Sequence, residues 1–144
     1  MNLILYYLFV YLIEAIILWL YCNRIFTSRK NTFLSLLITI GMFSLLIPVA
    51  ILTNAALNAF CSFIVYLCCI VLNYDSKPVW ALFHALALTI LMALSEGLIA
   101  AAIPDITIYA FRDGNIHSSA FTFVILSKSV YLCISQLVTR IFSK

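Results

Sequence analysis

Residues 3–22, LILYYLFVYLIEAIILWLYC, decide the fold class because they form an apolar run broken by a single charged residue, Glu14. Crossing the roughly 30 Å hydrocarbon core of a bilayer takes about 20 apolar residues of helix. The run is 20 residues long and predicts a membrane-spanning helix. We expect it to be retained rather than cleaved as a signal peptide, since no basic residue precedes it and no small-residue cleavage site follows it.

The same pattern recurs along the chain, at residues 33–53, 55–72, 79–103 and 119–139. Apolar residues make up 66% of the sequence and charged residues 9%, whereas a soluble domain carries about 25% charged residues. Transmembrane β-strands alternate apolar and polar residues, but these runs are continuous. The sequence therefore predicts an all-α integral membrane protein, a single bundle of about five transmembrane helices with no soluble domain.

Lysine and arginine are divided unequally between two sets of connections. The segments after the first and third runs and the C-terminal tail hold six of them, namely Arg24, Arg29, Lys30, Lys77, Arg140 and Lys144. The N-terminus, the turn near Asn54 and residues 104–118 hold only Arg112. Because cytoplasmic loops carry the excess of Lys and Arg, we expect the N-terminus outside, the C-terminus in the cytoplasm, and a location in the cell membrane.

Prolines and one short polar junction predict where helices begin, bend and end. Pro78 suits the first turn of the fourth helix, and Pro48 predicts a kink in the second. Pro104 marks the end of the fourth helix and the start of an outer loop. Only Thr53 and Asn54 separate the second and third runs, which leaves open a tight turn or one broken helix.

The five cysteines lie within the runs or at their ends and predict neither a disulfide framework nor a zinc site. Buried in a helix bundle, they behave as small apolar residues, with palmitoylation of Cys22 as the alternative. The net charge of +3 comes from scattered residues, so the bilayer rather than nucleic acid is the expected partner.

Four ionisable residues fall within the runs: Glu14, His84, Glu96 and Lys128. A charge at mid-bilayer costs about 2.5–3.5 kcal/mol, so such residues normally face the bundle interior and pair. At about 1.5 Å per residue, the two glutamates and Lys128 lie within roughly 6 Å of one another in depth. We therefore expect a Lys128–Glu96 pair with Glu14 near it. For His84 a capped or snorkelling side chain is expected, rather than a metal ligand.

Helical spacing predicts a polar interior around this pair. The expected ligand-facing residues are Glu14, Glu96, Lys128, Asn58 and Thr89 in the interior and Asp105, Arg112 and Asp113 in the outer loop. Ala93, Gly97 and Ala101 form a small-residue ridge where a neighbouring helix is expected to approach. Three interpretations stay open: a structural ion pair, a polar ligand pocket or switch, and a proton or ion path.

No motif predicts an enzyme or a cofactor. The chain has three glycines and no phosphate-binding loop, and the glutamates are not accompanied by a second in-span histidine for a metal. No cysteine lies within a few residues of His84 to make a nucleophile–base pair.

Two stretches, YLIEAIILWLYC at residues 11–22 and KPVWALFHA at residues 77–85 leading to Ser95 and Glu96, resemble one family. It is the N-terminal membrane region of bacterial sensor histidine kinases with a GHKL-type ATP-binding domain, including the accessory-gene-regulator class. The resemblance implies a sensor of a secreted peptide in a two-component system for quorum sensing, acting as a homodimer. The sequence departs from the family because it has no phospho-acceptor histidine and no ATP site. The expectation is an input domain without its own output.

Two rivals stay open. One is a small permease or transporter subunit, although no inverted repeat is visible and only Pro48 suggests a broken helix. The other is a structural or immunity-type membrane protein, in which the buried charges only fix the packing.

Overall fold

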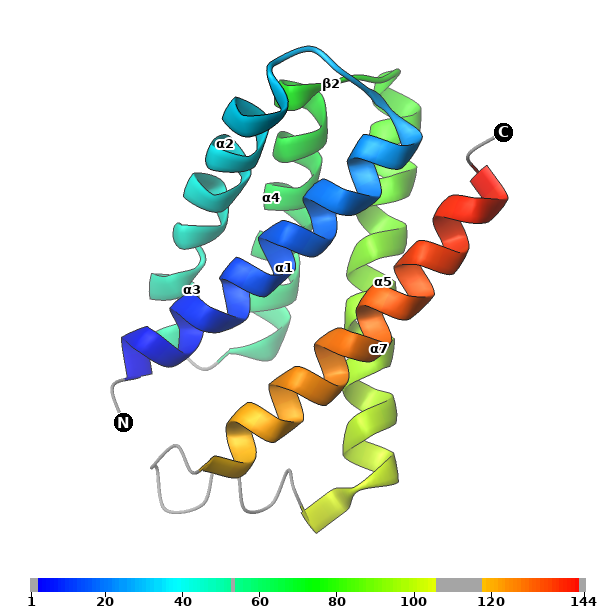
Figure 1. Cartoon of the computed structure of the whole chain (residues 1–144). Coiled ribbons are helices and arrows are strands. Elements are labelled where there is room, and N and C mark those ends of the chain that lie inside the picture. Colours follow the sequence, from blue (N-terminus) through cyan, green and yellow to red (C-terminus); the bar gives the residue numbers. More distant parts are fainter. Residues whose placement is uncertain (1–2, 53, 106–117, 143–144) are drawn as a thin grey trace.

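The computed structural model of the chain describes residues 3–52, 54–105 and 118–142 (Figure 1). Among these residues, five helical segments are long and apolar enough to cross a membrane, with α2 and α3 forming one of them, so the predicted helical fold and the number of spanning-length segments are confirmed. Their ends differ from the predicted ones by up to three residues. The elements are α1 (Leu3–Ile25), β1 (Thr27–Ser28), α2 (Thr32–Ser44), α3 (Ile47–Ile51), α4 (Ala55–Asn73), β2 (Tyr74–Asp75), α5 (Pro78–Ala102) and α7 (Ser118–Phe142).

The five spanning-length segments close into a ring. Helix α1 packs on α2, α2 on α4, α4 on α5, α5 on α7, and α7 returns to α1. In Figure 1, α1 and α7 run in the same direction and lie tilted across the more upright α2, α4 and α5. The ring therefore has an interior, and the residues buried most deeply are the ones that face it.

Pro48 interrupts the second segment, as predicted. A proline has no N–H, so residue 48 cannot donate to the carbonyl of Ser44, and α2 ends at that serine. The chain tightens instead, with the Leu46 N–H donating to the Phe43 carbonyl at 3.0 Å, before α3 begins at Ile47. The helix is therefore interrupted at residues 45–46, between α2 and α3, rather than smoothly bent.

The junction before α4 is a turn rather than a break in one helix. Helices α3 and α4 run in opposite directions (Figure 1). Asn54 begins α4, because its side-chain Oδ1 accepts a hydrogen bond from the Leu57 N–H at 3.0 Å. Of the two alternatives that the sequence leaves open, the tight turn is the one found.

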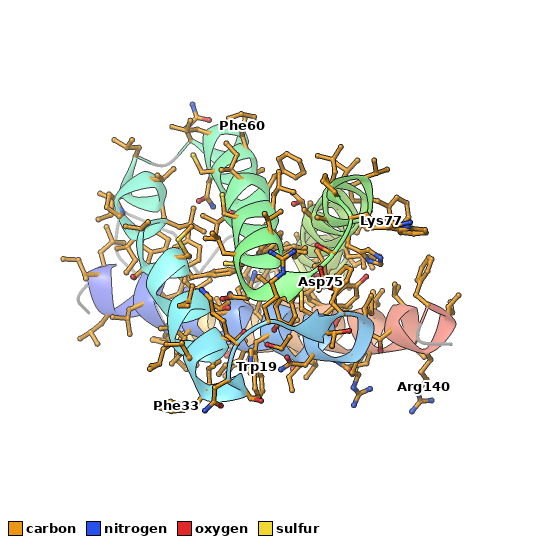
Figure 2. The ribbon with its side chains drawn as sticks, turned by 90° about the horizontal axis from the view of Figure 1, so that it is seen from above. Trp19, Phe33, Phe60, Asp75, Lys77 and Arg140 are labelled. Atoms are coloured by element: carbon orange, nitrogen blue, oxygen red, sulfur yellow. The ribbon has the colours of Figure 1, made fainter. Side chains whose placement is uncertain are left out.

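The two basic connections meet at one end of the ring. Strand β1 pairs antiparallel with β2, and Arg29 bonds to Asp75 at 3.1 Å. Figure 2 views this end, with Asp75 over the bundle and Arg140 at its rim. We call it the basic end, and the opposite end, which holds Leu3, the N-terminal end. The start of α1 and the end of α7 lie at opposite ends of the bundle (Figure 1).

Tyr74 is buried at the basic end and links three elements by hydrogen bonds. Its hydroxyl accepts a hydrogen bond from Ser35 at 3.3 Å and donates one to Asn23 at 3.1 Å. Burial raises the pKa of Tyr74 to about 12, although the Ser35 hydrogen bond opposes the rise. The hydroxyl therefore keeps its proton at neutral pH and continues to donate, which ties α1, α2 and β2 together.

The small-residue ridge on α5 does not face a neighbouring helix, so this expectation is wrong. Ala93, Gly97 and Ala101 are exposed, and a Cβ added at Gly97 would meet nothing within 4 Å. Gly97 follows Glu96 in the chain and therefore lies about 100° around the helix from it. Since Glu96 faces the ring interior, the ridge lies on the outer surface.

The pairing of the two basic connections gives a direct test of the fold. Thr27 and Asp75 are cross-strand partners, so their Cα atoms lie about 4.5–5.5 Å apart, within disulfide reach. In a background without native cysteines, we expect Thr27→Cys with Asp75→Cys to form an intramolecular disulfide, measured as loss of thiol labelling after mild oxidation. Thr27→Cys with Asp105→Cys, at opposite ends, is the control. Equal cross-linking of both pairs would contradict the fold.

Candidate functional site

Three charged side chains from three helices meet inside the ring. The Lys128 ammonium of α7 lies 2.5 Å from Glu14 Oε1 of α1 and 2.5 Å from Glu96 Oε1 of α5. The side chains of Lys128 and Glu14 are each 3% exposed, and that of Glu96 is 41% exposed. The structure thus brings together the three residues that the sequence placed at one depth. We call them the charged triad.

The charged triad carries one more negative charge than positive when all three groups are ionised. Taking charges out of water costs several kcal/mol per ion, and only close pairing offsets that cost. The Lys128 ammonium is in contact with a carboxylate oxygen from each glutamate. The second oxygen of Glu14, Oε2, is buried and has no hydrogen-bond partner among the described residues.

A cavity of about 260 Å³ adjoins the charged triad. Its walls come from α1, α4, α5 and α7, and the triad forms its charged part. Three tyrosine rings, Tyr6, Tyr7 and Tyr11, line it on the α1 side. Tyr7 stacks on Tyr11 at 6.4 Å between ring centroids, which gives the cavity an aromatic wall beside two carboxylates.

The cavity lies in the half of the ring nearer the N-terminal end. Toward the basic end the interior is filled by buried side chains, among them Leu18, Tyr66, Leu88 and Tyr131. The Tyr66 hydroxyl donates to Met92 Sδ at 3.2 Å, and this contact joins α4 to α5 on the side of the cavity that faces the basic end. Glu96, with 41% of its side chain exposed, keeps the cavity accessible from outside the protein. Among the described residues, the ring interior between the cavity and the basic end is therefore filled by side chains.

The remaining predicted site residues fall in different places. Asn58 lines the cavity and accepts a hydrogen bond from the Tyr11 hydroxyl at 2.8 Å. Thr89 shares a face with Glu96 but lies about 10 Å closer to the basic end, beyond Met92, and its hydroxyl donates to the Ala85 carbonyl. Thr89 is therefore not part of the cavity wall. Asp105 is exposed, and Arg112 and Asp113 lie outside the described residues.

Several cavity residues were missed from the sequence. Tyr6, Val124 and Ser127 line the cavity but are not among the interior residues expected from the sequence. Val124 is four residues before Lys128, a spacing that puts both on one side of a helix. That four-residue spacing from Lys128 was the signal in the sequence that could have identified Val124.

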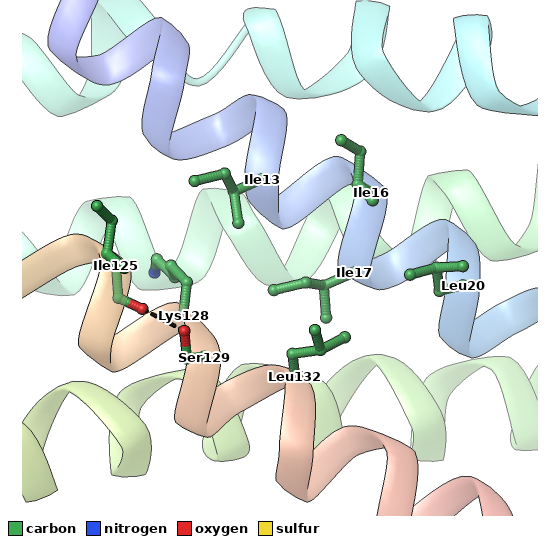
Figure 3. Close-up of a pocket in the computed structure, with 8 residues that line it drawn as sticks. All are labelled: Ile13, Ile16, Ile17, Leu20, Ile125, Lys128, Ser129 and Leu132. Carbon is green, nitrogen blue, oxygen red and sulfur yellow. Dashed lines mark hydrogen bonds between the residues drawn. The ribbon is translucent and has the colours of Figure 1, made fainter.

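A second hollow, between α1 and α7, is apolar (Figure 3). Its volume is about 190 Å³, and isoleucines and leucines such as Ile13, Ile17 and Leu132 form most of its wall. Lys128 lines one end of it, and Ser129 there donates to the Ile125 carbonyl at 2.6 Å. Lys128 thus contributes to both hollows, and its ammonium bonds to the two carboxylates of the polar one.

His84 is capped, as expected. Its Nδ1 lies 2.7 Å from the Tyr21 hydroxyl, and the rings of Phe26, Trp80, Phe83 and Phe142 surround it at 5.1–5.9 Å between centroids. Within residues 3–52, 54–105 and 118–142, no cluster of three His, Cys, Asp or Glu side chains is placed to hold a metal ion. His84 therefore joins α1, α5 and α7 by packing near the basic end.

The five-helix ring with a buried charged triad defines a helical bundle with a polar interior, a class that includes receptors, transporters and purely structural proteins. No protein-family model matches the chain, and no curated protein or solved structure matches it.

Neutralising either glutamate should cost less stability than removing the lysine. Glu14→Gln and Glu96→Gln each leave one Lys128–carboxylate pair intact, so we expect a loss of about 1.5–3 kcal/mol. Removing Lys128 leaves two carboxylates without a partner and costs about 3–5 kcal/mol. Thermal melting in detergent measures the relative stability of the three variants. Asp105→Asn, which changes an exposed residue, is the control. A glutamate variant that melts below Lys128→Met would contradict the bridging role of the lysine.

Proposed function

We propose that the chain is a multi-pass membrane sensor domain whose ligand binds in the cavity beside the charged triad. The observation that carries the proposal is that this cavity is lined by the charged triad, whose side chains hold three helices together. The interior between the cavity and the basic end is filled by buried side chains, which suits binding better than passage. A ligand that contacts Glu14 or Glu96 competes with Lys128 for these carboxylates. Such a ligand therefore weakens the ion pairs that hold α7 against α1 and α5.

The proposed orientation places the N-terminal end outside the cell and the basic end in the cytoplasm. The described residues of the basic end include Arg24, Arg29, Lys30, Lys77 and Arg140, in keeping with the excess of Lys and Arg in cytoplasmic loops. In this orientation the cavity lies in the half of the bundle nearer the outside of the cell. The proposed signal is therefore an extracellular one that reaches the charged triad from that side.

Helix α7 is the element proposed to carry the signal. It passes the charged triad at Lys128 and continues to the basic end, where the Phe142 and His84 rings lie 5.6 Å apart between centroids. A ligand shifts a two-state arrangement only by the difference in its affinity for the two states. In the ligand-free state Lys128 contacts Glu14 and Glu96. In the proposed ligand-bound state the ligand replaces one of these contacts, and this exchange supplies the difference in affinity.

The resemblance to the input region of GHKL-type sensor kinases supports the same proposal and suggests a secreted peptide as the signal. In that family the cytoplasmic output is a kinase domain, whose phospho-acceptor histidine and ATP site this sequence lacks. The exposed ridge of Ala93, Gly97 and Ala101 on α5 suits the homodimer that such kinases form, because small residues allow close approach of helices.

The test measures whether α7 moves. Spin labels at Arg140→Cys and Asp75→Cys, in nanodiscs and without native cysteines, report the distance from α7 to the α4–α5 connection. We expect a shift of about 1–5 Å when candidate secreted peptides bind, and also in the charge-neutral variant Glu14→Gln, Glu96→Gln, Lys128→Met. Labels at Asn54→Cys and Asp75→Cys, which bracket α4, should not move. Saturable peptide binding with a fixed α7 would contradict the proposal.

A permease subunit is the second candidate, and one observation favours it. The unpartnered Oε2 of Glu14 is a carboxylate atom buried in a ring of helices, where proton carriers place such groups. The filled basic half of the ring opposes a continuous path. Proton or solute flux in liposomes that is abolished by Glu14→Gln would favour the permease over the sensor.

A further inference from the structure

The charge balance of the cavity indicates the chemistry of its ligand. Two carboxylates and one ammonium face it, so an ionised site carries one uncompensated negative charge. Lys128 contacts both carboxylates, but its single positive charge balances only one of them. A ligand that brings one positive charge therefore completes the site, whereas an anion adds a second uncompensated charge.

The geometry provides an acceptor for that charge. Glu14 Oε2 is buried in a side chain that is 3% exposed, and it has no hydrogen-bond partner among the described residues. Glu96, on the opposite wall, is 41% exposed and so remains within reach of a ligand. Lys128 cannot act as an anion site, because both glutamates already hold its ammonium at 2.5 Å.

The aromatic wall suits the same ligand. Tyr6, Tyr7 and Tyr11 line the cavity, and the ring centroids of Tyr6 and Tyr7 lie 5.3 Å apart in an edge-to-face arrangement. Ammonium groups are attracted to the faces of such rings. A hydrated divalent metal ion is disfavoured, since the described residues contain no three-ligand cluster.

The size of the cavity limits how much of a ligand enters. Its volume of about 260 Å³ is below the range of about 300–1,000 Å³ that encloses drug-sized ligands. A single ammonium group on a short carbon chain fits, and a whole peptide does not. A peptide can therefore insert only one side chain or its amino terminus.

We infer that the cavity beside the charged triad is a binding site for an alkylammonium group, supplied either by a small free amine or by the amino group of a peptide. The inference rests on the proposed function in taking this cavity as the ligand site. It adds the sign of the ligand's charge and identifies Glu14 and Glu96 as the groups that recognise it.

The experiment uses propylammonium chloride as the probe, titrated into the intact chain in nanodiscs and followed by isothermal calorimetry. We expect saturable binding that is weakened about tenfold or more by Glu14→Gln or Glu96→Gln. Asp75→Asn changes an exposed acidic residue at the basic end, far from the cavity, and this variant should bind as the unmodified chain does. Propionamide, which has a similar size and no charge, should not bind.

A second arm identifies the source of the group. A short peptide with a free amino terminus is compared with the same peptide after acetylation. Binding of the free peptide alone assigns the group to a peptide terminus, and binding of propylammonium alone assigns it to a small amine. Both outcomes support the inference.

The inference is overturned if propylammonium binds no better than propionamide, or if Glu14→Gln and Glu96→Gln leave its affinity unchanged. The proposed function is tested by a different measurement, so the two can fail independently. If propylammonium binds and α7 stays fixed in the spin-label measurement, the ammonium site stands and the sensor role does not. If α7 moves with a peptide that lacks any amino group, the sensor role stands and the ammonium site does not.

Discussion

Replacing Lys128 by methionine is expected to lower the unfolding free energy by about 3–5 kcal/mol. The substitution keeps most of the side-chain volume but removes the ammonium from between Glu14 and Glu96, to which it is bonded at 2.5 Å on each side. Two like charges are then left facing each other in a poorly solvated interior. For a chain of this size the loss corresponds to a drop of roughly 10–15 °C in melting temperature.

The matched controls separate charge from packing. Lys77→Met changes an exposed lysine at the start of α5 and should alter stability by less than about 0.5 kcal/mol. The charge-neutral variant Glu14→Gln, Glu96→Gln, Lys128→Met should regain most of the lost stability, because neutral isosteres replace a buried ion pair at little cost. Melting is followed in detergent by circular dichroism. A Lys128→Met protein that melts with the unmodified chain would show that the glutamates do not depend on the lysine.

Reporter fusions along the chain should give an all-or-none pattern. A reporter that is active only in the cytoplasm is expected to work when inserted near Lys30, near Lys77 or after Lys144, and to be silent near Asn54 or before Leu3. The physical reason is the concentration of Lys and Arg in the first set of positions, since cytoplasmic loops retain these residues.

A reporter of the opposite kind, active only outside the cytoplasm, is the control and should give the inverse pattern. Because the start of α1 and the end of α7 lie at opposite ends of the bundle, the two termini must report opposite sides (Figure 1). Activity of one reporter at both termini would contradict the proposed span number and orientation.

The positions of the helices could be predicted because they depend on local quantities. A run of apolar residues and a rise of about 1.5 Å per residue give each helix and the depth of every charge along it. Glu14, Glu96 and Lys128 were therefore placed at one level correctly. Pro48 also acts locally, by lacking the N–H that α2 would need at that point.

The arrangement around the charged triad could not be predicted, because it depends on which helices touch. Thr89 has the right face but the wrong depth for a cavity whose floor is set by Tyr66 of α4. Gly97 lies one residue from Glu96 but faces outward, since the ring leaves that side of α5 uncovered. The pairing of β1 with β2 joins residues 46 or more positions apart, for which the sequence has no periodic signal.

The most direct test of the central claim is a double-mutant cycle between Glu14 and Lys128. The unfolding free energies of the unmodified chain, Glu14→Gln, Lys128→Met and the double variant are measured in one detergent. Direct contact predicts a coupling of about 0.5–3 kcal/mol or more, with the double variant more stable than Lys128→Met alone. Additive effects, with a coupling of zero within error, would contradict a charged triad that joins α1 to α7.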